Sequence, residues 1–321
     1  MRTETRSAAG KSNARTLKLY CAFMILPCVA VLFLVPLVVD TYWFANNAYF
    51  NWVPVRDYPY EVTGANADVV IFGDSSALAG VDPLLMQQQL GVSVVNLSPI
   101  VRSLFMMRDK PLAAYLKHNK PPKLIVIYLA VWQTEMPREE ASTDGLIVMM
   151  RHDNAADALG WAVRHPVGML NADIYLGNLI LGNLRQPVTM AGHNAAWNKH
   201  GFLPYPGVLP HLTASCVIGP QHHLARDFGA WPQLMVKRYQ SAQTDVVLYL
   251  APAPDCKGLG EYYRVADNIQ PRPINQWQVL DPNLFLDDIA DAHPEERFVP
   301  VTTQLLIDSL RPLISPVRGP A

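Results

Sequence analysis

The sequence predicts an α/β protein with a doubly wound, mostly parallel sheet, and three observations support this fold class. Four short runs rich in Val, Ile and Leu recur along the chain. They read ADVVIFG, VSVVNL, KLIVIYLA and DVVLYLA, at residues 67–73, 92–97, 123–130 and 245–251. The runs are almost continuously apolar, which is typical of strands buried on both faces of a parallel sheet. Helix-like segments lie between them, as strand–helix alternation requires.

The expected helices connect and close this sheet. Residues 83–90 begin with a proline, which fits the first turn of a helix. A longer segment, 103–118, ends before the string NKPP, and 302–310 forms a closing helix that ends near Pro312. A fifth strand is predicted at 277–280.

Residues 19–39 predict a transmembrane helix. These 21 residues carry no charge, and at about 1.5 Å per residue they match the thickness of the bilayer core. Five basic residues and one acid precede them, so we expect a cytoplasmic tail at 1–18 and export of the rest. The predicted location is the inner (cytoplasmic) membrane, crossed once, with the main domain periplasmic or extracellular. A cleaved signal peptide and a buried soluble helix are the alternatives.

The exported part divides into three regions. We expect an irregular juxtamembrane linker at 40–66 and an α/β domain formed by 67–134 and 230–321. Residues 135–229 interrupt the strand–helix pattern and are interpreted as an insertion subdomain. It forms either a wall or lid of a substrate cleft or a purely structural helical unit.

The composition and the cysteine and histidine positions bear on whether the chain binds nucleic acid, forms a disulfide or holds a metal. The net charge is −1, and without a basic patch outside the N-terminal tail the chain is not expected to bind nucleic acid. Cys216 and Cys256 fall in the exported part, where they either form a disulfide or remain free thiols. A disulfide would close a loop of about 40 residues and stabilise the fold by roughly 4 kcal/mol. His222 and His223 are adjacent, but no carboxylate or Cys pattern near them supports a metal site, and no metal or organic cofactor is predicted.

The string Gly73-Asp74-Ser75 directly follows the first predicted strand. Glycine allows a sharp turn there, which leaves the next side chains at the carboxyl edge of the sheet, where open α/β sheets place their active sites. A serine beside free backbone N–H groups offers a nucleophile and part of an oxyanion hole. Ser75 is therefore a candidate nucleophile.

Four stretches of the sequence resemble the SGNH (GDSL-type) hydrolases. VVIFGDSSALAGVDP is similar to their first block in membrane-anchored members. LGVSVVNLS and YLKHNKPPKLIVIYLAVW are similar to the second and third strands, and FLDDIADAHPEERFVPVTTQLLIDSL loosely resembles the last block. The resemblance covers about 67–133 and 244–314. It implies acyl transfer through a serine acyl-enzyme.

The resemblance also assigns the catalytic residues. It implies that Ser75 is the nucleophile and His293 the general base, with a carboxylate behind the imidazole. The usual acid position, three residues before the histidine, is Ala290 here. Asp291 matches the D-x-H spacing of the alginate-type polysaccharide O-acetyltransferases, and Asp288 is the reserve, with Asp287.

The oxyanion hole departs from the family pattern. The second block lacks its glycine, and the third lacks its G-x-N-D string. The expected donors are the Ser75 backbone N–H and the side chains of Asn96 and Gln133, with Ser98 as a further possibility.

These observations lead to two functional hypotheses. The first is a membrane-anchored esterase or O-acetyltransferase that acts on a cell-envelope or exopolysaccharide ester. Its expected partners are the glycan or acyl ester substrate, the lipid bilayer and a membrane protein that donates the acyl group. The second is a non-catalytic SGNH-like domain that binds glycan or serves as a scaffold, which the departures from the family pattern favour.

Overall fold

A computed structural model describes most of the α/β domain and short pieces of the remaining chain. The described residues are 16–23, 52–99, 104, 107–135, 149, 151–152, 160–161, 163–165, 167, 197–204, 209–218, 228–287 and 292–314. Most of the predicted membrane segment 19–39 lies outside them, because 24–39 are not described. Among the helices that the structure describes, none combines the length and the apolar character needed to cross a bilayer.

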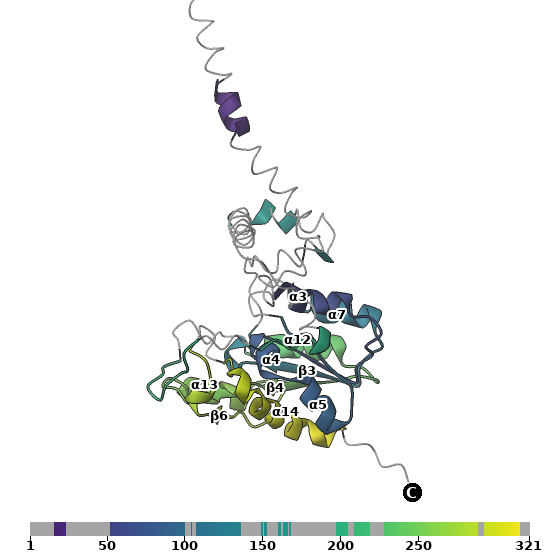
Figure 1. Cartoon of the computed structure of the whole chain (residues 1–321), viewed down its shortest axis with the longest axis vertical. Helices are drawn as coiled ribbons and strands as arrows, with labels where there is room; N and C mark the ends of the chain where they lie inside the picture. Colours follow the sequence, from purple (N-terminus) through teal and green to yellow (C-terminus); the bar gives the residue numbers. More distant parts are fainter. Residues whose placement is uncertain are drawn as a thin grey trace, which may run out of the picture.

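The centre of the domain is a parallel sheet of four strands, in the order β2-β1-β3-β4 (Figure 1). Its strands are β1 (Val69–Gly73), β2 (Val94–Asn96), β3 (Leu124–Leu129) and β4 (Asp245–Leu250). Neighbours pair in parallel register, with Val69 opposite both Val94 and Leu124. The α/β class and the four predicted strands are confirmed.

Helices cover both faces of this sheet because alternate side chains of each strand point to opposite sides. Val70 and Phe72 of β1 belong to one apolar core, and Val69 and Ile71 to the other. The first core is closed by α3 (Trp52–Glu61), α7 (Lys110–His118), α12 (Ala230–Tyr239) and α13 (Gly260–Asn268). The second is closed by α5 (Pro83–Leu90) and α14 (Val299–Ile314) (Figure 1).

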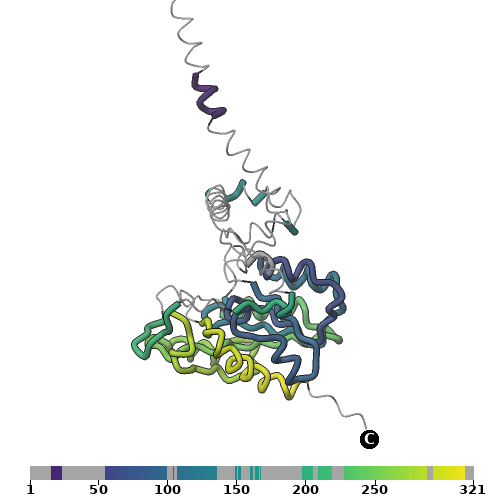
Figure 2. Tube along the Cα trace, in the orientation of Figure 1, coloured from purple at the N-terminus to yellow at the C-terminus, as the bar shows by residue number. Residues whose placement is uncertain are grey.

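The closing helix α14 packs beside α5, so segments from opposite ends of the domain are neighbours (Figure 2). The Thr302 hydroxyl donates to the Gly80 carbonyl at 2.7 Å, and the Asp82 N–H donates to the Thr303 hydroxyl at 3.0 Å. These bonds fix the N-terminal part of α14 against α4 (Ser75–Gly80). Helix α14 ends at Ile314, near Pro312 as the sequence predicts.

Three predicted elements differ from the structure. The expected irregular linker at 40–66 contains helix α3, because Val55 and Tyr58 lie on one face of this helix and are buried. The expected fifth strand at 277–280 is reduced to β6 (Val279–Leu280), which pairs with β5 (Ala253–Pro254) in a separate two-stranded sheet. Of the helix expected at 103–118, the structure describes α7, which begins at Lys110 and ends at His118.

The described parts of 135–229 are attached to the α/β domain at several points. The Asn96 N–H donates to the His200 carbonyl at 2.9 Å, and the Leu212 N–H donates to the Phe285 carbonyl at 2.9 Å. Cys216 and Cys256 form a disulfide, which confirms the predicted pairing. These contacts place 197–204 and 209–218 against the α/β domain, and Leu212 and Ile218 belong to its first core.

Removing the disulfide is expected to lower the free energy of unfolding by about 4 kcal/mol, because the cross-link restricts a loop of 40 residues in the unfolded chain. A Cys216→Ser/Cys256→Ser double variant, followed by urea denaturation, measures this loss. Cys21→Ser is the matched control, since Cys21 is an exposed free thiol. Equal unfolding midpoints for the double variant and wild type would contradict the stabilising role.

Candidate active site

Ser75 occupies the turn between β1 and α4, at the carboxyl edge of the sheet. Strand β1 ends at Gly73, whose backbone lies so close to β3 that a Cβ atom there would stand 1.6 Å from the Tyr128 carbonyl oxygen. Asp74 then caps α4, and Ser75 is its first residue. Ser75 therefore lies just after a buried strand, as the sequence predicts.

The two neighbouring serines have different surroundings. Ser76 is buried, and both its N–H and its hydroxyl donate to Asp74 Oδ1. Ser75 is 6% exposed, and neither its N–H nor its hydroxyl is hydrogen-bonded to any residue that the structure describes. The Ser75 hydroxyl is therefore available for chemistry, whereas the Ser76 hydroxyl is engaged in the turn.

Asp74 connects this turn to the end of β3. Its Oδ2 accepts the Ala130 N–H at 2.9 Å, while its Oδ1 accepts the Ser76 N–H at 2.8 Å. Burial raises the pKa of Asp74 above its ordinary value, opposed by the hydrogen bonds from Ser76 and Ala130 and by the charge of His293. Sequence reasoning assigned no role to this residue, although an Asp before a short helix is a recognisable N-cap signal.

His293 lies on the loop that leads into α14 and is 3% exposed. The Leu286 N–H donates to the His293 carbonyl at 3.0 Å, which fixes the backbone of this loop. The next residue, Pro294, lies against Gly80 of α4, where an added Cβ would be 3.4 Å from Pro294 Cγ. This contact places the His293 loop beside α4, the helix that begins with Ser75.

The predicted carboxylate partners of His293 are not described. Asp291 and Asp288 fall within 288–291, outside the described residues, as does Ala290. Asp287 is described and exposed, and its N–H donates to the Pro210 carbonyl at 2.7 Å.

The predicted oxyanion donors differ in availability. The Asn96 amide nitrogen donates to the Ala77 carbonyl at 2.8 Å and to the Val81 carbonyl at 3.4 Å, so this side chain is used to hold α4. Ser98, two residues later, is 1% exposed, and its hydroxyl has no partner among the described residues. Gln133 ends the 3₁₀ turn η2 (Val131–Gln133), and its buried Oε1 has no described partner. This oxygen is an acceptor, so only the amide Nε2 of Gln133 could donate to an oxyanion.

One cluster has the composition of a metal site but contains a cation of its own. Asp57, Glu61 and His152 bring ligand atoms within 4.8 Å of one another. Arg151 Nε lies 3.0 Å from Asp57 Oδ2, and Arg151 Nη2 lies 3.5 Å from Glu61 Oε1. The guanidinium pairs with both carboxylates, so the cluster is an ion-pair network that joins α3 to 151–152. His222 and His223 lie outside the described residues.

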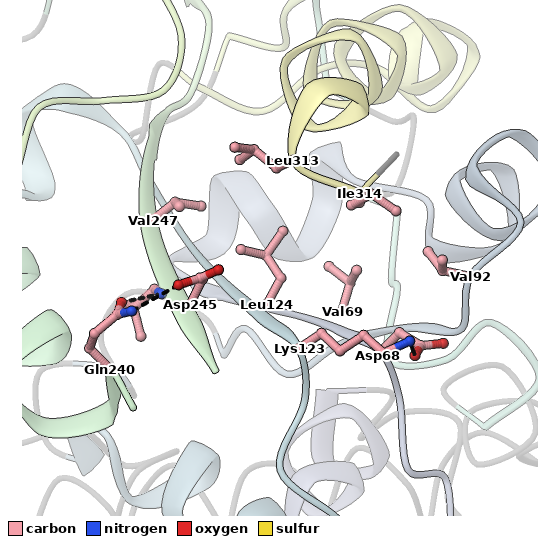
Figure 3. Close-up of a pocket in the computed structure, with 11 residues that line it drawn as sticks. Asp68, Val69, Val92, Lys123, Leu124, Gln240, Asp245, Val247, Leu313 and Ile314 are labelled. Carbon is pink, nitrogen blue, oxygen red and sulfur yellow. Dashed lines mark hydrogen bonds and ion pairs between the residues drawn. The ribbon is translucent and has the colours of Figure 1, made fainter. Parts of the chain in front are cut away.

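A pocket of about 270 Å³ lies at the opposite edge of the sheet (Figure 3). Its walls include the starts of β1, β3 and β4 and the end of α14, and the Asp68–Lys123 ion pair stands at its side, with a 2.9 Å separation. Because Ser75 follows the carboxyl end of β1, this pocket is separate from the candidate site.

Comparisons with known proteins add no further assignment. Searches of protein families, of curated proteins and of solved structures return no match for this chain.

Proposed function

We propose that this protein is a serine acyl-transfer enzyme of the SGNH type, either an esterase or an O-acetyltransferase. One observation carries the proposal. The Ser75 hydroxyl has no hydrogen bond to any described residue, at the carboxyl edge of a parallel sheet, and the residue after the buried His293 packs against the helix that begins with Ser75. Sequence resemblance to the SGNH blocks supports the same roles for these two residues.

In the proposed reaction, His293 takes the proton of the Ser75 hydroxyl as Ser75 Oγ bonds to the acyl carbonyl carbon. The Ser75 backbone N–H and side-chain donors from Gln133 and Ser98 stabilise the negative charge on the carbonyl oxygen. The imidazolium then gives its proton to the leaving alcohol. We leave Asn96 out of this oxyanion hole because its amide hydrogens are used within the fold.

The second half of the reaction decides the class of enzyme. Water as the acceptor makes an esterase, and a sugar hydroxyl makes an O-acetyltransferase. The predicted membrane anchor and the disulfide Cys216–Cys256, which is stable in oxidising compartments, support an exported enzyme. We therefore propose a cell-envelope or exopolysaccharide ester as substrate, with a membrane protein as the acyl donor for a transferase.

A fluorophosphonate probe tests the function without knowledge of the substrate. We expect the probe to label the wild-type chain on Ser75, with the labelled peptide identified by mass spectrometry. Ser75→Ala is expected to lose the label. Ser76→Ala is the matched control and keeps it, because the Ser76 hydroxyl is engaged with Asp74.

An alternative proposal is a non-catalytic glycan-binding or scaffold domain. The engagement of Asn96 and the absence of the usual second-block glycine favour it. A folded wild-type chain that the probe does not label would support this alternative and reject the enzyme.

A further inference from the structure

The Cys216–Cys256 disulfide fixes one part of residues 209–218, which we call the cross-linked segment. Cys256 follows β5, the strand that comes next after β4 in the chain. Beside the disulfide, the Lys257 N–H donates to the Cys216 carbonyl at 3.0 Å, and the Ile218 N–H donates to the Lys257 carbonyl at 2.9 Å. The cross-linked segment is therefore joined to the carboxyl side of the central sheet by a covalent bond and by backbone hydrogen bonds.

The part of the cross-linked segment that precedes the disulfide pairs with the stretch that leads to the His293 loop. The Leu212 N–H donates to the Phe285 carbonyl at 2.9 Å, and the Asp287 N–H donates to the Pro210 carbonyl at 2.7 Å. Leu212 and Phe285 are both buried in the first core. The stretch before the His293 loop is thus held from one side by the cross-linked segment.

That stretch, residues 284–287, pairs with the His293 loop on its other side. The Leu286 N–H donates to the His293 carbonyl at 3.0 Å, and the Glu295 N–H donates to the Leu284 carbonyl at 3.1 Å. Neighbouring backbone groups of an extended stretch point to opposite sides, so one stretch can pair with two others. Residues 284–287 therefore lie in the middle, and through them the cross-linked segment holds the backbone of the His293 loop.

We propose that the cross-linked segment is a positioning element of the acyl-transfer reaction, and that the Cys216–Cys256 disulfide keeps the His293 loop in place for the proposed base. The inference rests on the proposed function and adds a dependence on the disulfide. Without the disulfide, residues 209–218 are held only by hydrogen bonds and side-chain packing, so these residues and the His293 loop separate from the domain more often. His293 then takes the proton of Ser75 less effectively, because proton transfer needs the two side chains at hydrogen-bonding distance.

The Cys216→Ser/Cys256→Ser double variant removes the disulfide. Its matched control is Leu112→Ala, which shortens a fully buried side chain of α7. This substitution lowers the overall stability and leaves the cross-linked segment unchanged. Urea denaturation of both variants establishes how closely their losses of stability agree.

A phosphine reductant is the second route if the double variant does not fold. It opens the disulfide in the folded wild-type chain, in which Cys216 is half-buried and its neighbours Ser215 and Val217 are exposed. The phosphine takes an oxygen atom from water and becomes the phosphine oxide, while each sulfur gains a proton from that water. The reduced chain is then compared with Leu112→Ala in the same two measurements.

The first measurement needs no enzymatic activity. Hydrogen exchange of full-length chains, resolved to single residues by mass spectrometry, follows the backbone amides of Leu286 and Glu295. At matched stability, we expect both amides to exchange at least about tenfold faster in the double variant than in Leu112→Ala. Equal exchange rates in the two variants overturn the inference, because the disulfide would then act only on the overall stability.

The second measurement is the rate at which a fluorophosphonate labels Ser75, followed against pH. The double variant is expected to react about 100-fold more slowly than wild type and to lose the acid limb of the profile, which reports the base. Leu112→Ala is expected to keep both the rate and the acid limb. A double variant that is labelled as fast as Leu112→Ala overturns the inference. If wild type is not labelled, the proposed function fails, whereas the exchange rates still decide whether the disulfide holds the His293 loop.

Discussion

Gly73→Ala is expected to destroy the native fold, with a loss of more than about 4 kcal/mol in the free energy of unfolding. The added Cβ would stand 1.6 Å from the Tyr128 carbonyl oxygen, and that oxygen belongs to the central strand β3. Neither backbone can move aside without breaking the β1–β3 pairing that positions Ser75. The measurement is the yield of soluble protein together with its thermal unfolding.

Gly260→Ala is the control for this substitution. Gly260 is the first residue of α13, and a Cβ there meets no atom within 4 Å. We expect unchanged or slightly higher stability, because alanine favours helix more than glycine does. A Gly73→Ala chain that unfolds at the same temperature as wild type would show that β1 and β3 do not approach as closely as described.

Ser75 and His293 are expected to behave as one catalytic unit. Ser75→Ala and His293→Gln should each reduce turnover of an activated ester by about 10⁴-fold to 10⁶-fold. The double variant should lose hardly more than either single one, because each change alone already removes the proton transfer that the other residue needs. Steady-state kinetics of the four proteins measure this non-additivity.

His211→Gln is the matched control for the histidine. His211 lies near the same loop, with its Nε2 3.2 Å from Glu295 Oε2, but it is partly exposed and not close to the Ser75 turn in the described contacts. The turnover of the His211→Gln variant should stay near that of wild type. If the two single losses multiplied in the double variant, Ser75 and His293 would act independently, and the proposed mechanism would be wrong.

The strands could be predicted because each is recognisable within its own sequence. Residues 69–73 and 124–129 are apolar throughout, and this pattern holds wherever a strand is buried on both faces. Helix α3 could not be predicted in this way. Its core residue Tyr58 is buried through contacts with distant segments, including an edge-to-face contact with Trp197, and no local pattern reports such partners.

In the site, too, some features follow from neighbouring residues, and others depend on contacts between distant segments of the chain. Ser75 follows a strand in a glycine turn, so its position could be predicted from neighbouring residues. The position of the His293 loop beside α4 depends on the packing of α14 against α4 and α5. The use of Asn96 to hold α4 depends on the register between β1 and β2. Both are properties of the folded chain and could not be seen in the sequence.

The bond between the Thr302 hydroxyl and the Gly80 carbonyl joins residues that are 222 positions apart in the sequence. This separation sets the order in which the parts of the site are synthesised. During synthesis, Gly80 therefore leaves the ribosome 222 residues before Thr302. A chain that ends before residue 293 would carry the proposed nucleophile Ser75 without the proposed base His293. If the chain is exported during synthesis, the proposed pair would come together only after export.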